Sequence, residues 1–100
     1  MTPIDRCAVA AATTGYDFAA ALERNYQRGF VFSTPDFFIM GWDDGGAWFI
    51  DGAAGDLSKA WSVLPYELPI IRFMRKDLEL RSYPLSVVKR LTHHEMAQTA

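Results

Sequence analysis

The chain has 100 residues, half of them apolar and 14% aromatic, and its formal net charge is −2 at pH 7. This composition predicts one folded domain over residues 1–100 and excludes a mainly disordered chain. Cys7 is the single cysteine, which excludes an internal disulfide and a four-cysteine zinc site. No run of about 18 apolar residues is present, and the N-terminus lacks the pattern of a signal peptide. We therefore expect a soluble protein that is not exported.

The N-terminal part predicts a helix behind a short leading segment. Residues 1–15 are small and mostly polar, and they are typical of either a mobile arm or a short helix. Residues 16–28 carry apolar side chains at helical spacing, and Gly29 can form the C-terminal cap. The expected apolar stripe of this helix consists of Phe18, Ala21, Leu22 and Tyr26.

The centre of the chain predicts a β-hairpin over residues 37–50, after a short strand at 30–33 and a turn at 34–36. The loop falls at residues 43–46, where glycine accepts the positive φ that hairpin turns need. Both strands are apolar at nearly every position, so both faces of the sheet should be covered. The cover can come from the chain's own helices, from a second copy or from a partner protein.

The following segment predicts a short helix and a second hairpin. Asp56 is a suitable N-cap for a helix over residues 57–64, which Pro65 ends. The second hairpin has strands at 69–75 and 78–83, with alternating apolar and charged side chains. One of its faces should hold Ile71, Phe73, Leu78 and Leu80, and the other Arg72, Glu79 and Arg81.

The end of the chain predicts a last helix that begins at Pro84, with a frayed tail over residues 93–100. The whole pattern predicts an α+β fold in the order α-β-ββα-ββα. Its sheet should be mainly antiparallel, with four to five strands, and about three helices should pack on it.

Few residues suggest chemistry, and the simpler interpretation is favoured at each. Gly52 to Asp56 could hold a phosphate between a strand and a helix, but Asp56 places a carboxylate where the anion would sit. Adjacent histidines His93 and His94 point apart on a helix, and Cys7 has no evident base. Asp43 and Asp44 are expected to be solvated turn residues. The sequence predicts no catalytic residue, no metal site and no cofactor.

Binding residues are more plausible candidates than catalytic ones. Residues 1–69 hold four Lys and Arg against nine Asp and Glu, whereas residues 70–100 hold six against three. This asymmetry can steer a partner, but it does not favour nucleic acid in a chain of acidic pI. Large aromatic and arginine side chains are enriched at interface hot spots. The expected partner-binding residues are Phe38, Trp42, Trp48, Arg72, Arg75 and Arg81.

Three segments carry a resemblance to a known group of proteins: residues 31–41 (VFSTPDFFIMG), 47–50 (AWFI) and 64–69 (LPYELP). They resemble small uncharacterised proteins encoded by tailed bacteriophages, and the resemblance spans residues 30–92. It implies a phage protein that acts in virion assembly or on a host target, in the host cytoplasm or in the virion.

A more distant similarity is to the acetyltransferase superfamily, some of whose phage-encoded relatives are degenerate. In that superfamily the acyl-carrier pyrophosphate sits on a glycine-containing turn between a strand and a helix, a place comparable to that of Gly52 and Gly55. The Arg or Gln that opens the family's motif is absent here.

Two classes of function follow from these observations. The first is a non-enzymatic binding or structural protein that contacts a host protein, a virion protein or a second copy of itself. The alternative is a small acetyltransferase-like enzyme, or its cofactor-binding remnant, centred on Gly52 to Asp56.

Overall fold

The computed structural model describes the backbone of residues 1–74 and 79–99, and the side chains of residues 1–74 and 79–92. The elements in chain order are α1 (Pro3–Thr13), α2 (Phe18–Arg28), β1 (Phe30–Ser33), β2 (Phe37–Asp43), β3 (Ala47–Gly55), α3 (Leu57–Ala60), the 3-10 turn η1 (Trp61–Val63), β4 (Ile70–Met74), β5 (Leu80–Pro84) and α4 (Leu85–Thr99). The fold is α+β with a mostly antiparallel sheet, which confirms the predicted class.

The five strands lie side by side in the order of the sequence, β1-β2-β3-β4-β5. Three of the four neighbouring pairs are antiparallel, but β3 and β4 run parallel, joined through α3 and η1. A bulge interrupts the pairing of β2 and β3, because Met40 pairs with Gly52 while the next residue, Gly41, pairs with Ile50. Asp51 is therefore an extra residue of β3 at the centre of the sheet.

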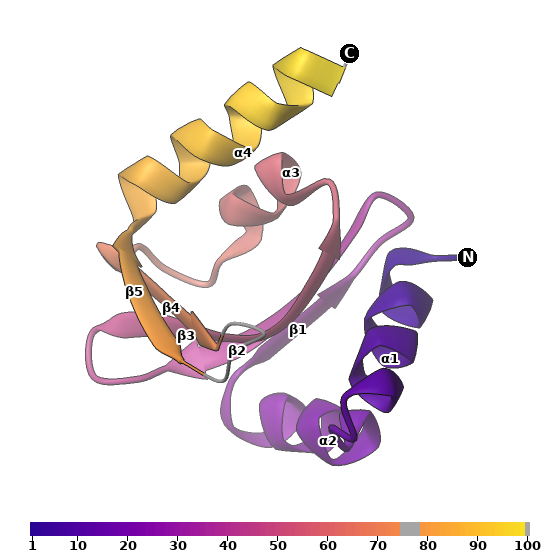
Figure 1. Ribbon diagram of the computed structural model, residues 1–100. Coiled ribbons are helices and arrows are strands. Elements are labelled where there is room, and N and C mark those ends of the chain that lie inside the picture. The colour runs from indigo at the N-terminus through magenta and orange to yellow at the C-terminus, as the bar shows by residue number, and fades with distance from the viewer. Residues whose placement is uncertain (75–78, 100) are drawn as a thin grey trace.

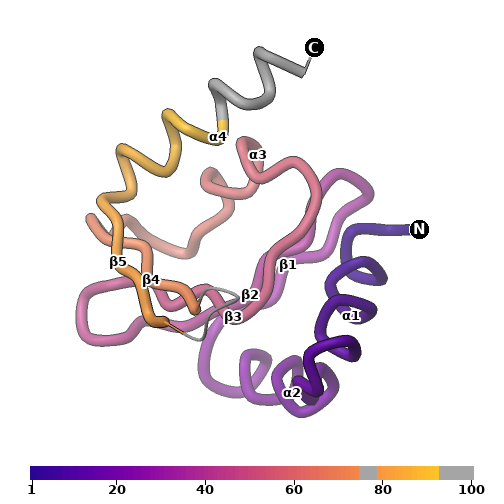
Figure 2. The backbone as a smooth tube through the Cα atoms, viewed as in Figure 1, coloured from indigo at the N-terminus to yellow at the C-terminus, as the bar shows by residue number. Residues whose placement is uncertain are grey.

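Helices lie on both sides of this sheet (Figures 1 and 2). On one face α1 packs on β2 and β3, and α2 packs on β1 and β2. On the other face α3 packs on β2, and α4 packs on β4 and β5. The cover predicted for both faces of the central hairpin thus comes from the chain's own helices.

Each face has its own group of buried residues. The side of α3 and α4 holds the larger cluster: Phe30, Phe37, Ile39, Trp48, Ala60, Trp61, Ile71 and Leu85. The side of α1 and α2 holds a smaller one: Ala21, Phe38 and Met40. Neighbouring β2 residues alternate between the two clusters, as expected for a strand buried on both faces.

The N-terminal segment resolves one open alternative and corrects one prediction. Residues 3–13 form a helix, whose N-cap Thr2 accepts a hydrogen bond from the Asp5 backbone N–H at 3.3 Å.

In α2, Tyr26 was expected in the apolar stripe but is 68% exposed, and Asn25 is buried instead. Asn25 takes that place because its side-chain amide donates to the Ala21 carbonyl and to Asp51.

The C-terminal hairpin corrects a second prediction. Met74 pairs with Leu80 and Phe73 with Arg81, so Leu80 lies on the face of Arg72 and not on that of Phe73. A one-residue change in register moves every side chain to the opposite face, and the sequence pattern did not determine this register. Leu78 lies outside the described residues.

The last helix also differs from its prediction. Pro84 is the final residue of β5, so α4 begins at Leu85 instead of at the proline. The backbone of α4 is helical to Thr99. The frayed tail expected over residues 93–100 falls on residues whose side chains lie outside the described part of the chain. Among the helices of the described residues, none is long and apolar enough to cross a membrane.

Candidate functional site

One part of the sheet carries large side chains that the helices of the described residues leave mostly uncovered. We call it the open face. It is formed by β4 and β5 and by the adjoining ends of β2 and β3, and it lies on the face of the sheet that α1 and α2 partly cover. Strand pairing aligns Trp42 with Phe49, Phe49 with Arg72, and Met74 with Leu80 on this side. The residues of the open face are Trp42, Phe49, Ile70, Arg72, Met74 and Leu80.

Three apolar side chains of the open face are exposed to solvent. Ile70 is 36%, Met74 49% and Leu80 53% exposed to solvent. Single exposed apolar residues are common on protein surfaces, but a contiguous group on one sheet face often marks an interaction site.

An aromatic pair borders the open face where it meets α2. The rings of Trp42 and Phe49 stack with centroids 4.4 Å apart, and both residues are half-buried. The Arg24 guanidinium from α2 lies 5.7 Å from the centre of the Trp42 ring, within the range of a cation–π contact. These contacts fix the tryptophan at the border of the open face.

Arg72 is held in the middle of the open face. Its Nη1 donates to Asp44 Oδ2 at 2.8 Å, and its Nε donates to Ser82 Oγ at 3.0 Å. An exposed ion pair of this kind contributes little to stability, about 0–1 kcal/mol. It does hold the guanidinium in a fixed position with its charge balanced by the β2-β3 loop.

The other predicted binding residues lie elsewhere. Phe38 and Trp48 are 0% and 2% exposed, so they belong to the two clusters and leave no surface for a partner. This corrects the expectation at both positions, because aromatic residues on both parities of the hairpin are covered by helices. Arg81 pairs with Glu79 at 2.7 Å. Arg75 lies outside the described residues.

A cavity of about 390 Å³ lies on the opposite side of the sheet, under α4. The lining residues are Ile50, Asp51, Gly52, Ala53, Leu57, Trp61, Ile71, Phe73, Met74, Val88 and Thr92. The cavity lies where β3 and β4 stop pairing, because their register ends at Ile50 and Phe73 while β3 continues to Gly55. Its walls are mostly apolar, and its size is within the range of ligand pockets.

Asp51, the bulge residue, organises a polar cluster on the side of α1 and α2. Its carboxylate accepts hydrogen bonds from Arg24 Nη2 and from Asn25 Nδ2, each at 2.8 Å, and from the Tyr16 hydroxyl. The Asp51 side chain is only 5% exposed. Burial and the hydrogen bond to Asp51 raise the pKa of Tyr16 to about 12.

Sequence reasoning did not predict this cluster. The available signal was a carboxylate inside an apolar strand, since a buried charge needs partners. The positions of Tyr16, Arg24 and Asn25 gave no sign that they were those partners.

The glycine-containing segment is structural in this fold. Gly52 to Gly55 is the end of β3, and not the turn that the sequence suggested. Asp56 caps α3 by accepting from the Ser58 backbone N–H at 3.2 Å and from the Ser58 hydroxyl at 2.5 Å. This confirms Asp56 as the N-cap.

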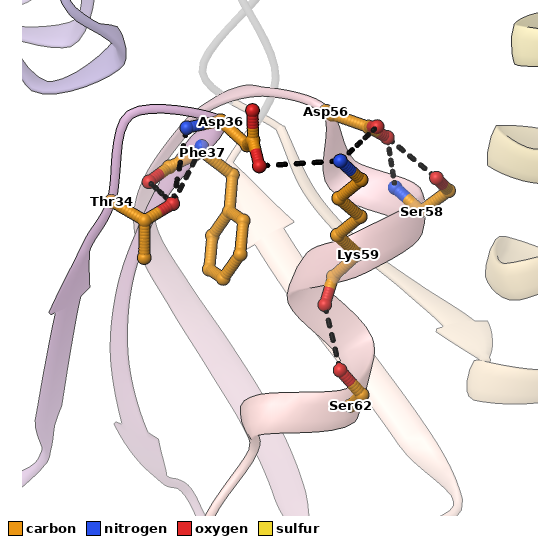
Figure 3. A network of polar contacts seen from close by, with 7 residues as sticks. All are labelled: Thr34, Asp36, Phe37, Asp56, Ser58, Lys59 and Ser62. Carbon is orange, nitrogen blue, oxygen red and sulfur yellow. Dashed lines mark hydrogen bonds and ion pairs between the residues drawn. The ribbon is translucent and has the colours of Figure 1, made fainter.

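The charges around that cap leave no site for an anion. Figure 3 shows Lys59 between two carboxylates, Asp36 at 3.2 Å and Asp56 at 4.0 Å. A phosphate placed here would meet two negative charges and only one positive charge, which is already paired.

The remaining candidates have simple structural explanations. Burial raises the pKa of Cys7, although a backbone hydrogen bond from Ala53 opposes the shift, so its reactive thiolate is disfavoured. Asp43, the exposed last residue of β2, accepts from the Tyr66 hydroxyl at 2.6 Å, and this bond lowers the pKa of Asp43. No metal-binding group of His, Cys, Asp and Glu side chains occurs in the described part of the chain. The side chains of His93 and His94 lie outside that part.

Comparisons with known proteins add no relative. A scan against protein-family models found no match, and searches of curated proteins and of solved structures found none either. The function therefore has to be argued from the geometry.

Proposed function

We propose that this protein acts by protein–protein contact and that the open face is its binding surface. The observation that carries the proposal is the set of exposed apolar side chains on β4 and β5, next to the Trp42 and Phe49 pair and around a fixed arginine. Apolar and aromatic side chains beside an arginine are the composition typical of interface centres.

The charges favour a protein partner over nucleic acid. Arg72 is neutralised by Asp44, and the chain as a whole carries a net charge of −2. Nucleic-acid binding depends on cations that are free to neutralise phosphates, and it usually comes with a basic surface. A protein surface with an apolar centre matches the open face better.

The resemblance to small phage proteins supports a more specific form of the proposal. The partner is then a host protein that the chain inhibits or a protein of the virion, and the chain acts in the host cytoplasm or in the particle. A second copy of the chain is the remaining alternative.

The test uses two variants whose original side chains are almost equally exposed. Leu80→Asp places a charge on the open face, and Val9→Asp places one on α1, where Val9 is 52% exposed. Tagged wild-type protein and both variants are used to capture proteins from a lysate of the candidate host. We expect a captured partner that Leu80→Asp loses at least about tenfold and that Val9→Asp retains, and direct titration of the purified partner should reproduce this difference.

Two outcomes decide between the forms of the proposal. Equal capture by both variants would exclude the open face as the binding surface. The other outcome is a capture that yields no partner, while light scattering shows that the wild type self-assembles and that Leu80→Asp does not. The partner is then a second copy, and a structural role is favoured.

A second candidate function is acyl-carrier binding, as a small acetyltransferase-like enzyme or its remnant. The favouring observation is that Gly52 and Ala53 line the cavity at the end of β3. The carboxylates of Asp36 and Asp56 oppose it, because they lie where the carrier's phosphates would be expected. Thermal unfolding with and without an acyl-carrier thioester is the test, since a ligand of the native state must raise the melting temperature. No shift at high thioester concentration would exclude this function.

A further inference from the structure

The last part of β3 has a free edge. The strand pairs with β2 along its length, but its pairing with β4 covers only Ala47 to Ile50. From Asp51 to Gly55 the edge that faces away from β2 has no strand partner among the described residues. An edge of this kind presents backbone donors and acceptors to any extended chain that reaches it.

The direction of the backbone groups can be derived at the end of this edge. The Asp56 N–H donates to the Asp36 carbonyl at 2.8 Å, on the side of β2. In a trans peptide the preceding C=O points the opposite way, so the Gly55 carbonyl faces the free edge. The register with β2 is unbroken from the Asp36 and Asp56 pair to Met40 and Gly52. Hydrogen-bonded pairs alternate along an antiparallel ladder, so the Ala53 N–H and C=O also face the free edge. These two carbonyls have no strand partner among the described residues, so they can accept hydrogen bonds from an incoming chain.

The cavity lies beside this edge. Gly52 and Ala53 of the edge form part of its wall, Phe73 and Val88 form other parts, and the half-exposed Met74 lies at its rim. No charged side chain of the described residues is available inside it, because the Asp51 carboxylate is occupied by Arg24 and Asn25 on the other side of the sheet. As far as the described residues line it, the site therefore combines backbone hydrogen-bonding groups with an uncharged, apolar space.

We propose that the free edge of β3 and the adjoining cavity bind an extended peptide strand of another protein, with apolar side chains at alternate positions. Backbone hydrogen bonds along a strand edge combined with pockets for alternate side chains are a general mode of peptide recognition. A ligand held by its charges does not match the described lining of the site, where the available polar groups are neutral backbone groups. The inference deepens the proposed function, since it adds a second protein contact on the opposite face.

Selection from a library of short random peptides tests the proposal with a defined probe. We expect enriched peptides with apolar residues at alternate positions. N-methylation of the backbone amides that face β3 removes their donors without changing the side chains, and it should weaken binding about tenfold. An enriched peptide that binds equally well after N-methylation would overturn strand pairing.

Variants locate the binding site. Ala53→Leu fills the cavity from β3, and Val88→Phe fills it from α4, so one variant remains if the other fails to fold in a thermal melt. Either should abolish peptide binding, while Leu80→Asp should leave it unchanged. Binding lost in Leu80→Asp and kept in the filled variants would support the open face and overturn this inference.

Two further results would also contradict the inference. One is a library that yields no enriched peptide. The other is a cavity-filling variant whose melting temperature no longer rises with an acyl-carrier thioester but which still binds the peptide. The proposed function can fail independently, because its own test depends on Leu80 and not on the cavity.

Discussion

The two halves of the sheet differ in how they are covered. In the half formed by β1, β2 and β3, helices lie on both faces, and Phe38, Ile39 and Met40 are all 0% exposed in succession. In the half formed by β4 and β5, the described helices cover only the face toward α4, where Ile71 is 1% exposed, whereas Met74 on the other face is 49% exposed. The same sheet thus has one half that provides the core and one that provides a surface, and substitutions in the two should have different effects.

The largest effect should come from Trp48→Ala in the covered half. The ring lies in edge contact with Phe30, with centroids 5.2 Å apart, and its Nε1 donates to the Tyr66 carbonyl at 3.1 Å. Truncation of a buried aromatic side chain to alanine costs about 3–5 kcal/mol. In denaturant unfolding we expect this loss, or a chain that does not fold at all. A loss below about 1 kcal/mol would show that the covered half does not hold the fold together.

A smaller loss is expected for Asp51→Ala, which removes the centre of the cluster that ties α2 and Tyr16 to β3. Loss of a buried hydrogen-bonding partner costs about 1–3 kcal/mol, and here Asn25, Arg24 and Tyr16 each lose one bond to the Asp51 carboxylate. Asp36→Ala is the matched control, since its pair with Lys59 is exposed on both sides and should contribute only about 0–1 kcal/mol. Equal losses in the two variants, measured by urea unfolding, would contradict the assigned role of Asp51.

Part of this stability should be lost at alkaline pH, because it depends on the proton of Tyr16. Its pKa is raised from an ordinary value of 10.0 to about 12, so the folded state holds the proton more tightly than the unfolded state. The contribution is fully present below about pH 10 and is lost as the pH rises toward about 12. We expect the stability difference between wild type and Tyr16→Phe to be larger at about pH 9 than at about pH 12. A difference that stays constant over this range would mean that Tyr16 does not keep its proton in the folded state.

The covered half was the more predictable one. Apolar residues on both parities of residues 37–50 predicted burial on both faces, and the loop glycines Gly45 and Gly46 do have positive φ, at 65° and 93°. Strand order and the parallel pairing of β3 with β4 did not follow from local patterns, because they depend on where the α3 connection returns.

The candidate site was less predictable. Trp42 and Arg72 were expected to contact a partner, and both lie on the open face, but Phe38 and Trp48 were chosen by residue type alone and are buried. Aromatic side chains stabilise cores and interfaces by the same physics, so composition cannot separate the two. Leu80 was missed because its face depends on a strand register that the alternation of the hairpin did not define.

The smallest effect on stability should therefore come from Leu80→Asp, although Leu80 is apolar and lies in a strand. Its side chain is already about half exposed, and substitutions at such positions usually change stability by no more than about 0.5 kcal/mol. The same is expected for Val9→Asp on α1, and urea unfolding of the two variants should give midpoints close to that of the wild type. A marked loss in Leu80→Asp alone would mean that the residue is covered in solution, for example by a second copy. In that case the loss should become smaller on dilution of the wild type, because the stability of a dimer depends on concentration.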